Sequence, residues 1–156
     1  MSTRSAAPAW EALFRAQVTA MRRFEAARDF APLRSREYDV LFNLAQMGGS
    51  ARQHELNERL LISQPSLSRM VDRLVAAGHL QRQECSADGR GVVVALTTAG
   101  AQLQRTIGRR HVRHITEIID GALNEDEQRT LIELTNKVRA SATVEVAEAP
   151  REEGTP

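Results

Sequence analysis

The spacing of hydrophobic residues predicts a helix at the start of the chain. Over residues 8–28, apolar side chains recur at steps of three and four, which gives one stripe wide enough to pack against another helix. Pro32 closes this segment. The stripe consists of Trp10, Leu13, Phe14, Val18, Met21 and Phe24.

A second and a third helix follow. Ser35 fits the N-cap position of the second helix, and the glycine pair at 48–49 ends it. The third helix is predicted over residues 52–60, after a capping box formed by Ser50 and Gln53. These boundary signals predict two separate short helices.

The fourth predicted helix has two distinct faces. Ser63 is placed to cap its N-terminus, Pro65 falls in the first turn, where proline is tolerated, and Gly78 ends it. Residues spaced i, i+3, i+4, i+7 and i+8 form the expected core face, which consists of Leu67, Met70, Val71, Leu74 and Val75. The opposite face would present Pro65, Ser66, Ser68, Arg69, Asp72 and Arg73 to solvent.

Two strand-like runs come after the fourth helix. Residues 80–85 alternate apolar and polar side chains, and residues 92–96 are β-branched and apolar. The turn between them contains Asp88-Gly89-Arg90, which favours a hairpin. A helix followed by a hairpin is the order of a winged helix, which lays one helix in a DNA groove and reaches a second groove with the hairpin tip.

The rest of the chain is predicted to be helical with an irregular end. Thr97 or Thr98 would cap a fifth helix to about residue 120, and a sixth helix follows Gly121. From Thr143 the sequence is rich in Glu, Ala and Pro without periodicity, so we predict a disordered acidic tail. The apolar faces of the end helices exceed what a small winged-helix core covers. We therefore predict a two-fold homodimer through these helices.

Composition narrows the function classes. The chain has 156 residues, of which 42% are hydrophobic and 26% charged, which fits one globular domain. One cysteine excludes an internal disulfide, and no enzyme motif is present. Without a signal peptide or a stretch of about 20 apolar residues, a cytoplasmic protein that is neither an enzyme nor membrane-associated is expected. The net charge of +1 means that any DNA contact depends on locally placed basic residues.

The outward face of the fourth helix offers side chains that can read DNA. Gln suits adenine, Arg suits guanine and Ser reaches phosphate, whereas a solvated helix face is the alternative. The hairpin favours DNA, because Arg90 would enter a minor groove while Asp88 orients its guanidinium. The expected DNA-contacting residues, with Arg73 on the backbone, are Ser63, Gln64, Pro65, Ser66, Ser68, Arg69, Arg73, Asp88 and Arg90.

These motifs together resemble the MarR (multiple antibiotic resistance regulator) family of bacterial transcription factors, over about residues 8–140. Gly89 departs from the family pattern, which often has a basic residue between the wing Asp and Arg. The resemblance implies a homodimer on a pseudo-palindromic operator, usually a repressor released by a small phenolic or aromatic carboxylate ligand. The matching residues are Ser68-Arg69-Met70-Val71, Leu74, Gly78, Arg82, Asp88, Arg90 and Leu96-Thr97-Thr98-Ala99-Gly100.

The resemblance also implies a ligand site between the dimer helices and the winged domain. Asp39, Arg69 and Arg82 fall at positions that some family branches use to bind urate-like anions. Trp10 is a weaker match, because those branches carry their tryptophan on an additional N-terminal helix. Since Arg69 would belong to both sites, a bound anion would act on the DNA-reading helix. The alternative is an ion-pair network that only positions this helix.

Two other groups of side chains suggest sensors. Cys85 would be a peroxide sensor if its thiol were reactive, but Arg82 would point to the opposite face of the strand, so an inert cysteine is favoured. His111 and His114 have a metal-compatible spacing but lie in a basic run, which is more typical of a solvated or phosphate-facing surface. No metal or other cofactor is therefore expected. A redox- or metal-responsive regulator and a winged-helix protein-interaction module are the alternatives.

Together, the patterns predict a mainly α fold with a small β-hairpin wing, in which a winged helix-turn-helix region is embedded in a helical dimerisation domain. The expected function is sequence-specific binding of double-stranded DNA to regulate transcription, under a small aromatic or anionic effector. The expected segments are 1–34 for the N-terminal dimerisation helix, 35–97 for DNA binding, 98–142 for the C-terminal dimerisation helices and 143–156 for the acidic tail.

Overall fold

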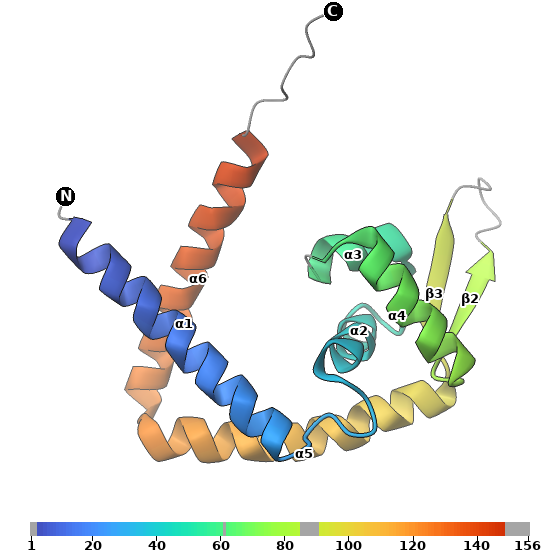
Figure 1. Ribbon diagram of the computed structural model, residues 1–156, viewed down its shortest axis with the longest axis horizontal. Coiled ribbons are helices and arrows are strands. Elements are labelled where there is room, and N and C mark those ends of the chain that lie inside the picture. Colours follow the sequence, from blue (N-terminus) through green and yellow to red (C-terminus); the bar gives the residue numbers. More distant parts are fainter. Residues whose placement is uncertain (1–2, 61, 85–90, 149–156) are drawn as a thin grey trace, which may run out of the picture. The chain divides into compact units, whose positions relative to one another are not determined.

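The computed structural model describes residues 3–60, 62–84 and 91–148, and these are the described residues below. They form a mainly helical fold with one small antiparallel sheet (Figure 1), as predicted. The chain divides into two compact units, residues 1–114 and 115–156. None of the described helices is long and apolar enough to cross a membrane. The elements are α1 (Thr3–Ala26), α2 (Ser35–Gln46), β1 (Ser50–Arg52), α3 (Gln53–Leu60), α4 (Gln64–Ala76), β2 (Leu80–Glu84), β3 (Val92–Leu96), α5 (Thr98–Ala122) and α6 (Glu125–Glu148).

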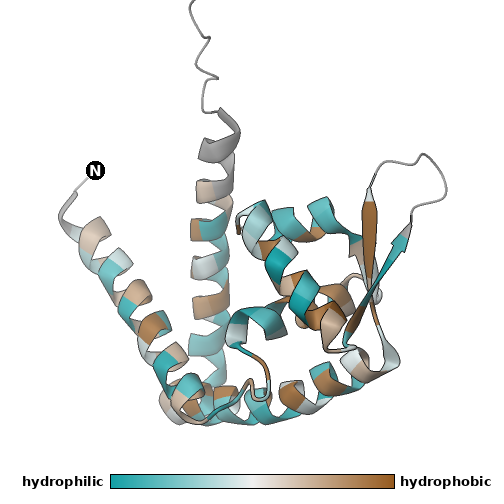
Figure 2. Cartoon of the chain, turned by 45° about the vertical axis from the view of Figure 1, so that its right-hand side comes forward, coloured by the Kyte–Doolittle hydropathy of each residue, from teal (hydrophilic) through white to brown (hydrophobic). Residues whose placement is uncertain are grey.

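The core of the first unit lies between α2, α3, α4 and the sheet. Leucines and valines from all of these elements are excluded from solvent, and burying each such side chain contributes about 1.5–3 kcal/mol. In Figure 2, β3 is hydrophobic while β2 is hydrophilic, in keeping with their sequences. The side chains with at most 2% exposure in this core are Val40, Leu41, Leu44, Leu56, Leu67, Val71, Leu74, Leu80 and Val94.

Helix α4 has the two faces that its periodicity predicts. Ser63 caps it, with its Oγ accepting a hydrogen bond from the Ser66 N–H at 3.4 Å. Gly78 follows the helix with a φ of +75°, a conformation that glycine adopts without steric cost. Four residues of the predicted core face are buried, namely Leu67, Met70, Val71 and Leu74, and Val75 is partly buried.

The sheet has a strand that sequence patterning missed. Both β1 and β2 pair with β3, so the strand order is β1-β3-β2. Ala51 of β1 lies opposite Val94, and Leu80 of β2 lies opposite Leu96. The capping box predicted from Ser50 and Gln53 is wrong, because residues 50–52 are extended. Instead, the Arg52 N–H donates to Glu55 Oε2 at 3.1 Å. Three residues are too few to show an alternating pattern, and β1 exists only because the edge of β3 is available to pair with it.

Two helix starts also differ from prediction. α1 begins at Thr3, five residues before the expected start, in an alanine-rich stretch that favours helix despite Pro8. α2 begins at Ser35, so Ser35 is not the N-cap. The cap residue is Arg34, whose N–H donates to Glu37 Oε2 at 3.1 Å.

The start of α5 packs closely on the turn after α4. Thr97 is the capping residue, since its Oγ accepts from the Gly100 N–H at 3.0 Å and donates to the Gly78 carbonyl at 2.7 Å. A Cβ on Gly100 would lie 1.9 Å from the carbonyl oxygen of His79, so this close approach requires glycine. These contacts connect the end of α4 to the beginning of α5.

A buried carboxylate connects the turn after α1 to α5. Asp29 has no solvent exposure, and its oxygens contact Nδ1 of His111 at 2.9 Å and Nδ1 of His114. Arg110 donates to the carbonyl oxygens of Asp29 and Ala31. The interpretation of the two histidines as a solvated or phosphate-facing surface is therefore wrong, because both contact a buried carboxylate. The sequence did not reveal this contact, since Asp29 lies more than 80 residues away from them. Among the described residues, no group of three or more potential ligands is arranged to hold a metal.

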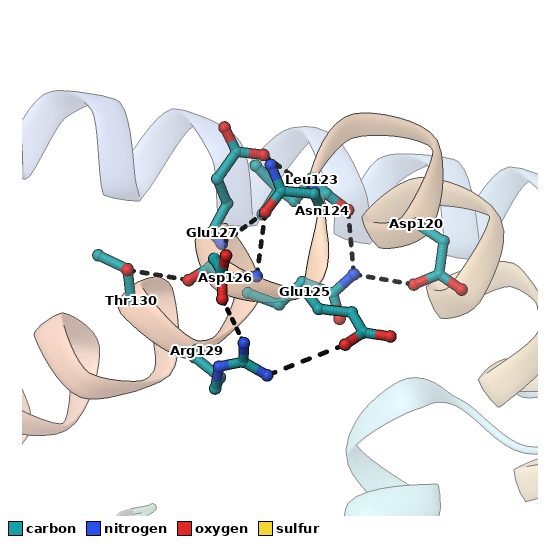
Figure 3. A network of polar contacts seen from close by, with 9 residues as sticks. Asp120, Leu123, Asn124, Glu125, Asp126, Glu127, Arg129 and Thr130 are labelled. Carbon is teal, nitrogen blue, oxygen red and sulfur yellow. Dashed lines mark hydrogen bonds and ion pairs between the residues drawn. The ribbon is translucent and has the colours of Figure 1, made fainter.

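In the second unit, a polar network defines the start of α6 (Figure 3). Asn124 Oδ1 accepts from the N–H groups of Asp126 and Glu127 at 3.0 Å, and Glu127 Oε2 accepts from the Asn124 N–H at 2.8 Å. α6 continues to Glu148, past Thr143, where we expected the irregular tail to begin. Residues 143–148 contain no glycine or proline to end the helix, and the remainder of the expected tail lies outside the described residues.

Candidate nucleic-acid interface and adjoining cavity

The outward face of α4 collects most of the predicted DNA-contacting residues. Ser63, Gln64, Pro65, Arg69 and Arg73 are exposed, and Ser66 and Ser68 are partly exposed. Ser63 Oγ donates to Ser66 Oγ at 2.8 Å, and a long 3.5 Å contact joins Arg69 Nη2 to the same serine. The helix therefore presents a row of hydroxyl, amide and guanidinium groups opposite its buried apolar face.

The tip of the hairpin is not part of this geometry. Asp88 and Arg90, predicted to reach DNA, and Cys85, the candidate sensor, lie outside the described residues. The strands that lead to the tip pair regularly, from Leu80 opposite Leu96 to Glu84 opposite Val92. The roles of the hairpin residues stay predictions.

A polar groove adjoins the start of α4. It has a volume of about 240 Å³. Its lining residues are Gln53, His54 and Asn57 of α3, Gln64 of α4, Gly91 just before β3, and Val92 at the start of β3. Asn57 Oδ1 is buried and has no hydrogen-bond partner among the described residues. The groove thus places amide and imidazole hydrogen-bonding groups beside the exposed face of α4.

Arg73 forms an ion pair that the sequence did not reveal. Its Nε donates to Glu37 Oε1 at 2.9 Å, which joins α4 to α2. The Arg73 side chain is 51% exposed, whereas that of Glu37 is only 12% exposed. Burial alone would raise the pKa of Glu37, but the Arg34 N–H and the Arg73 guanidinium outweigh it and hold this pKa below its ordinary value. Glu37 is therefore ionised at neutral pH.

A second ion pair joins α4 to β2. Arg82 Nη2 donates to Asp72 Oδ1 at 2.7 Å, and both side chains are more than a third exposed. Arg82 was expected at an anion site, and Asp72 was predicted only to face solvent. Because both side chains are solvated, the pair links the strand to the helix but adds little stability.

The structure does not gather the predicted ligand set. Trp10 is 63% exposed and stacks on Phe14 with ring centroids 6.5 Å apart. Desolvation raises the pKa of Asp39, although the charges of Arg36 and His111 oppose this. No described hydrogen bond or ion pair joins any two of Trp10, Asp39, Arg69 and Arg82, so their joint role stays a prediction.

A different cavity opens beside the Arg73–Glu37 pair, and both of these residues line it. Its volume is about 540 Å³, within the range of small-molecule sites. The walls come from the end of α1, the segment between α1 and α2, the start of α2, and Met70 and Arg73 of α4. The lining combines apolar Phe30, Leu33 and Met70 with two glutamates, Glu25 and Glu37, and four arginines, Arg28, Arg34, Arg36 and Arg73.

Sequence reasoning missed this cavity because its residues form no contiguous motif. The one available signal was the density of arginine between residues 28 and 36, just before a helix start. Glu37 at the third helical position was a capping signal, and nothing local indicated that it also holds an arginine 36 residues away. Both features depend on how α2 and α4 pack.

Comparisons with known proteins agree with this geometry. A model of the MarR family matches residues 32–91. An HTH-type transcriptional regulator of Bacillus anthracis is 31% identical over 121 residues, which cover 77% of this chain and 78% of the relative. The multiple antibiotic resistance protein MarR of Salmonella typhimurium is 30% identical over 102 residues, 65% of this chain and 70% of the relative.

Solved structures extend the similarity to the fold. A MarR family regulator from Streptomyces coelicolor, in complex with DNA, superposes with a TM-score of 0.77 at 25% identity and covers 90% of this chain and 89% of its own. The PcaV regulator of the same organism, in complex with its natural ligand, superposes with a TM-score of 0.64 at 26% identity. The match covers 78% of this chain and 90% of the PcaV chain. These relatives are transcriptional regulators rather than enzymes. The chain belongs to the MarR family of transcriptional regulators.

Proposed function

We propose that the chain is a homodimeric repressor that binds a pseudo-palindromic operator through α4 and is released by a small aromatic or anionic ligand. The observation that carries the DNA-binding part is the solvent-accessible row of Ser, Gln and Arg side chains on a helix whose opposite face is largely buried. A relative solved in complex with DNA supports it. We refer to α4 as the recognition helix.

The contacts are divided by side-chain chemistry. Arg69 and Gln64 suit base edges in the major groove, and the serines Ser66 and Ser68 suit nearby phosphates. The polar groove beside Gln64 would accept the DNA backbone as it passes between α3 and the hairpin. Arg90 on the hairpin would enter the minor groove.

Exposed apolar side chains support the dimer. On α6, Leu131, Leu134 and Val138 recur at i, i+3 and i+7 and are 40–54% exposed. On α1, Trp10 and Phe14 are 63% and 52% exposed. Such surfaces are normally covered in a soluble protein, and a second copy of the chain would cover them symmetrically.

The cavity beside Arg73 supports the response to a ligand. Its four arginines outnumber its two glutamates, which favours an anion, and its apolar walls favour a hydrophobic body. The PcaV regulator is known in complex with its natural ligand, which supports ligand control on this scaffold.

The proposed function is tested by operator binding. Fluorescence anisotropy with fragments of the DNA upstream of the gene should give a discrete complex that weakens as salt rises. Arg69→Ala should lose about 1–3 kcal/mol of binding and relax the base preference at one position in each half-site. Arg105→Ala, an exposed arginine on α5, is the matched control and should bind like the wild type.

Three outcomes would contradict the proposed function or part of it. Absence of a fragment-specific complex at low salt would favour the protein-interaction alternative. Equal binding by the Arg69→Ala variant and the wild type would remove α4 as the reading element. Loss of the complex on adding peroxide or zinc would favour the redox- or metal-responsive alternative over an organic ligand.

A further inference from the structure

Arg73 is the charged group of the recognition helix that lines the cavity. It reaches the cavity wall together with Met70, one turn earlier in the same helix. The other three cavity arginines, Arg28, Arg34 and Arg36, belong to the segment between α1 and α2 and to the start of α2. A bound anion that contacts Arg73 therefore acts directly on α4.

The Arg73 guanidinium already has a carboxylate partner from within the chain. Nε donates to Glu37 Oε1 at 2.9 Å, while Glu37 Oε2 is held by the Arg34 N–H at 3.1 Å. Both oxygens of this nearly buried carboxylate are thus engaged. Glu37 therefore occupies Arg73 Nε, a donor that the carboxylate of an effector would also use.

A second carboxylate cannot join this pair without cost. Two like charges about 4 Å apart in a partly desolvated site repel strongly enough to weaken binding by roughly tenfold or more. The other three arginines of the cavity still attract an anion toward it. The position against Arg73 Nε, which Glu37 now fills, becomes available only when Glu37 withdraws.

We propose that Glu37 is an internal competitor of the effector: an organic anion that enters the cavity displaces the Glu37 carboxylate from Arg73 and so breaks the direct link between α2 and the recognition helix. This inference rests on the proposed function, because it takes α4 as the DNA-reading helix and the cavity as the effector site. By reciprocity, the DNA-bound form, which keeps the link, binds the anion more weakly.

The variant Glu37→Gln tests the competition. Glutamine is accepted at this capping position and can still receive the Arg34 N–H, so the helix start is kept while the negative charge is removed. Glu25→Gln is the matched control, since Glu25 lines the same cavity from α1 and its side chain has no described ion pair. Benzoate is the probe, and benzamide is its neutral counterpart of the same shape.

Calorimetry on the full-length chain without DNA gives the first measurement. The Kd for benzoate should fall at least fivefold in Glu37→Gln and change less than twofold in Glu25→Gln. Benzamide binding should change less than twofold in both variants, because only the charged probe meets the competing carboxylate. In the operator assay, the ratio of Kd values with and without saturating benzoate should fall at least threefold in Glu37→Gln.

Four results would overturn the proposal. These are an unchanged benzoate affinity in Glu37→Gln, an equal gain in Glu25→Gln, an equal gain for benzamide, and no benzoate binding by either the wild type or Glu37→Gln. The proposed function fails separately, if the ligand-free wild type shows no specific operator complex. In that case the calorimetric comparison still decides whether Glu37 competes with anions.

A measurement on the wild type avoids dependence on the variant. The NMR resonance of Arg73 Nε–H reports its hydrogen bond to Glu37. It should shift as benzoate is added and stay in place with benzamide. A resonance that does not respond to saturating benzoate would show that the Arg73–Glu37 pair stays intact, contrary to the proposal.

Discussion

Asp29 and Glu37 are the buried acidic residues among the described residues, and each joins two elements. Asp29 contacts two histidines of α5, and Glu37 connects the start of α2 to the recognition helix. Buried carboxylates are tolerated only where hydrogen bonds and opposite charges replace water. Substituting either residue should therefore weaken a contact between two elements, which its position in a turn or at a helix start does not suggest.

The contribution of Glu37 to stability should depend on pH. Its pKa is lower in the folded chain, so the stabilisation is complete above the ordinary value of 4.5 and is lost as the pH falls below it toward the folded value. At neutral pH, Glu37→Gln should lower the free energy of unfolding by at most about 1 kcal/mol, because Arg73 is half exposed. Urea unfolding of both proteins at neutral and acidic pH measures this. A difference that stays constant down to about pH 3 would contradict it.

Asp29→Ala should destabilise the first unit strongly. It leaves the Nδ1 atoms of His111 and His114 without their carboxylate partner in a largely buried site, at a cost of about 2–5 kcal/mol. Thermal unfolding followed by circular dichroism measures the loss. The control Asp126→Ala removes an exposed carboxylate of α6 that pairs within its own helix, and should cost no more than about 1 kcal/mol. Equal losses in the two variants would refute the importance of the Asp29 cluster.

At the scale of elements, the recognition helix depends on what holds its two ends. Ser63 caps the beginning, and the turn after Gly78 is held against α5 by Thr97 and by the close approach of Gly100. Ion pairs to α2 and to β2 add two lateral contacts, through Arg73 and Asp72. The orientation of α4 thus depends on three neighbouring elements.

Two glycines of α5 should respond oppositely to substitution by alanine. At Gly100 the added Cβ would lie 1.9 Å from the His79 carbonyl oxygen, so Gly100→Ala should cost about 1–3 kcal/mol and weaken operator binding by shifting the end of α4. At Gly121 nothing lies within 4 Å of the added Cβ, and Gly121→Ala should stabilise by up to about 1 kcal/mol. Chemical denaturation compares them. The same sign of change in both would contradict this assignment.

At the scale of the whole molecule, operator recognition should require a pair of chains. Leu134→Glu combined with Val138→Glu places two charges on the exposed apolar stripe of α6. Sedimentation should then give the mass of one chain, 17.3 kDa, and operator affinity should fall, because each half-site is bound independently. The control Asn136→Glu adds a charge at an exposed polar position of α6 and should leave the dimer intact. A double variant that stays dimeric would exclude this stripe from the interface.

Local sequence patterns determined the elements to which we assign DNA recognition. The two faces of α4, its cap at Ser63 and its end before Gly78 follow from periodicity, capping chemistry and glycine conformation, all of which act within a few residues. The strand pair within residues 80–96 follows in the same way, from alternation in the first strand and from a β-branched apolar run in the second. The family resemblance depended on the same contiguous stretch, which explains why the fold class and the family were predicted correctly.

Only the tertiary structure decided which side chains meet. Glu37 and Arg73 are 36 residues apart, Asp29 and His114 are 85 apart, and β1 is a strand only because β3 offers it an edge. A hydrophobic pattern specifies which face of an element is buried, because burial depends on each residue's own polarity. It does not specify which residue of a distant element lies opposite, because that depends on how the packed elements are arranged. The cavity and the ion pair beside it are consequences of that packing.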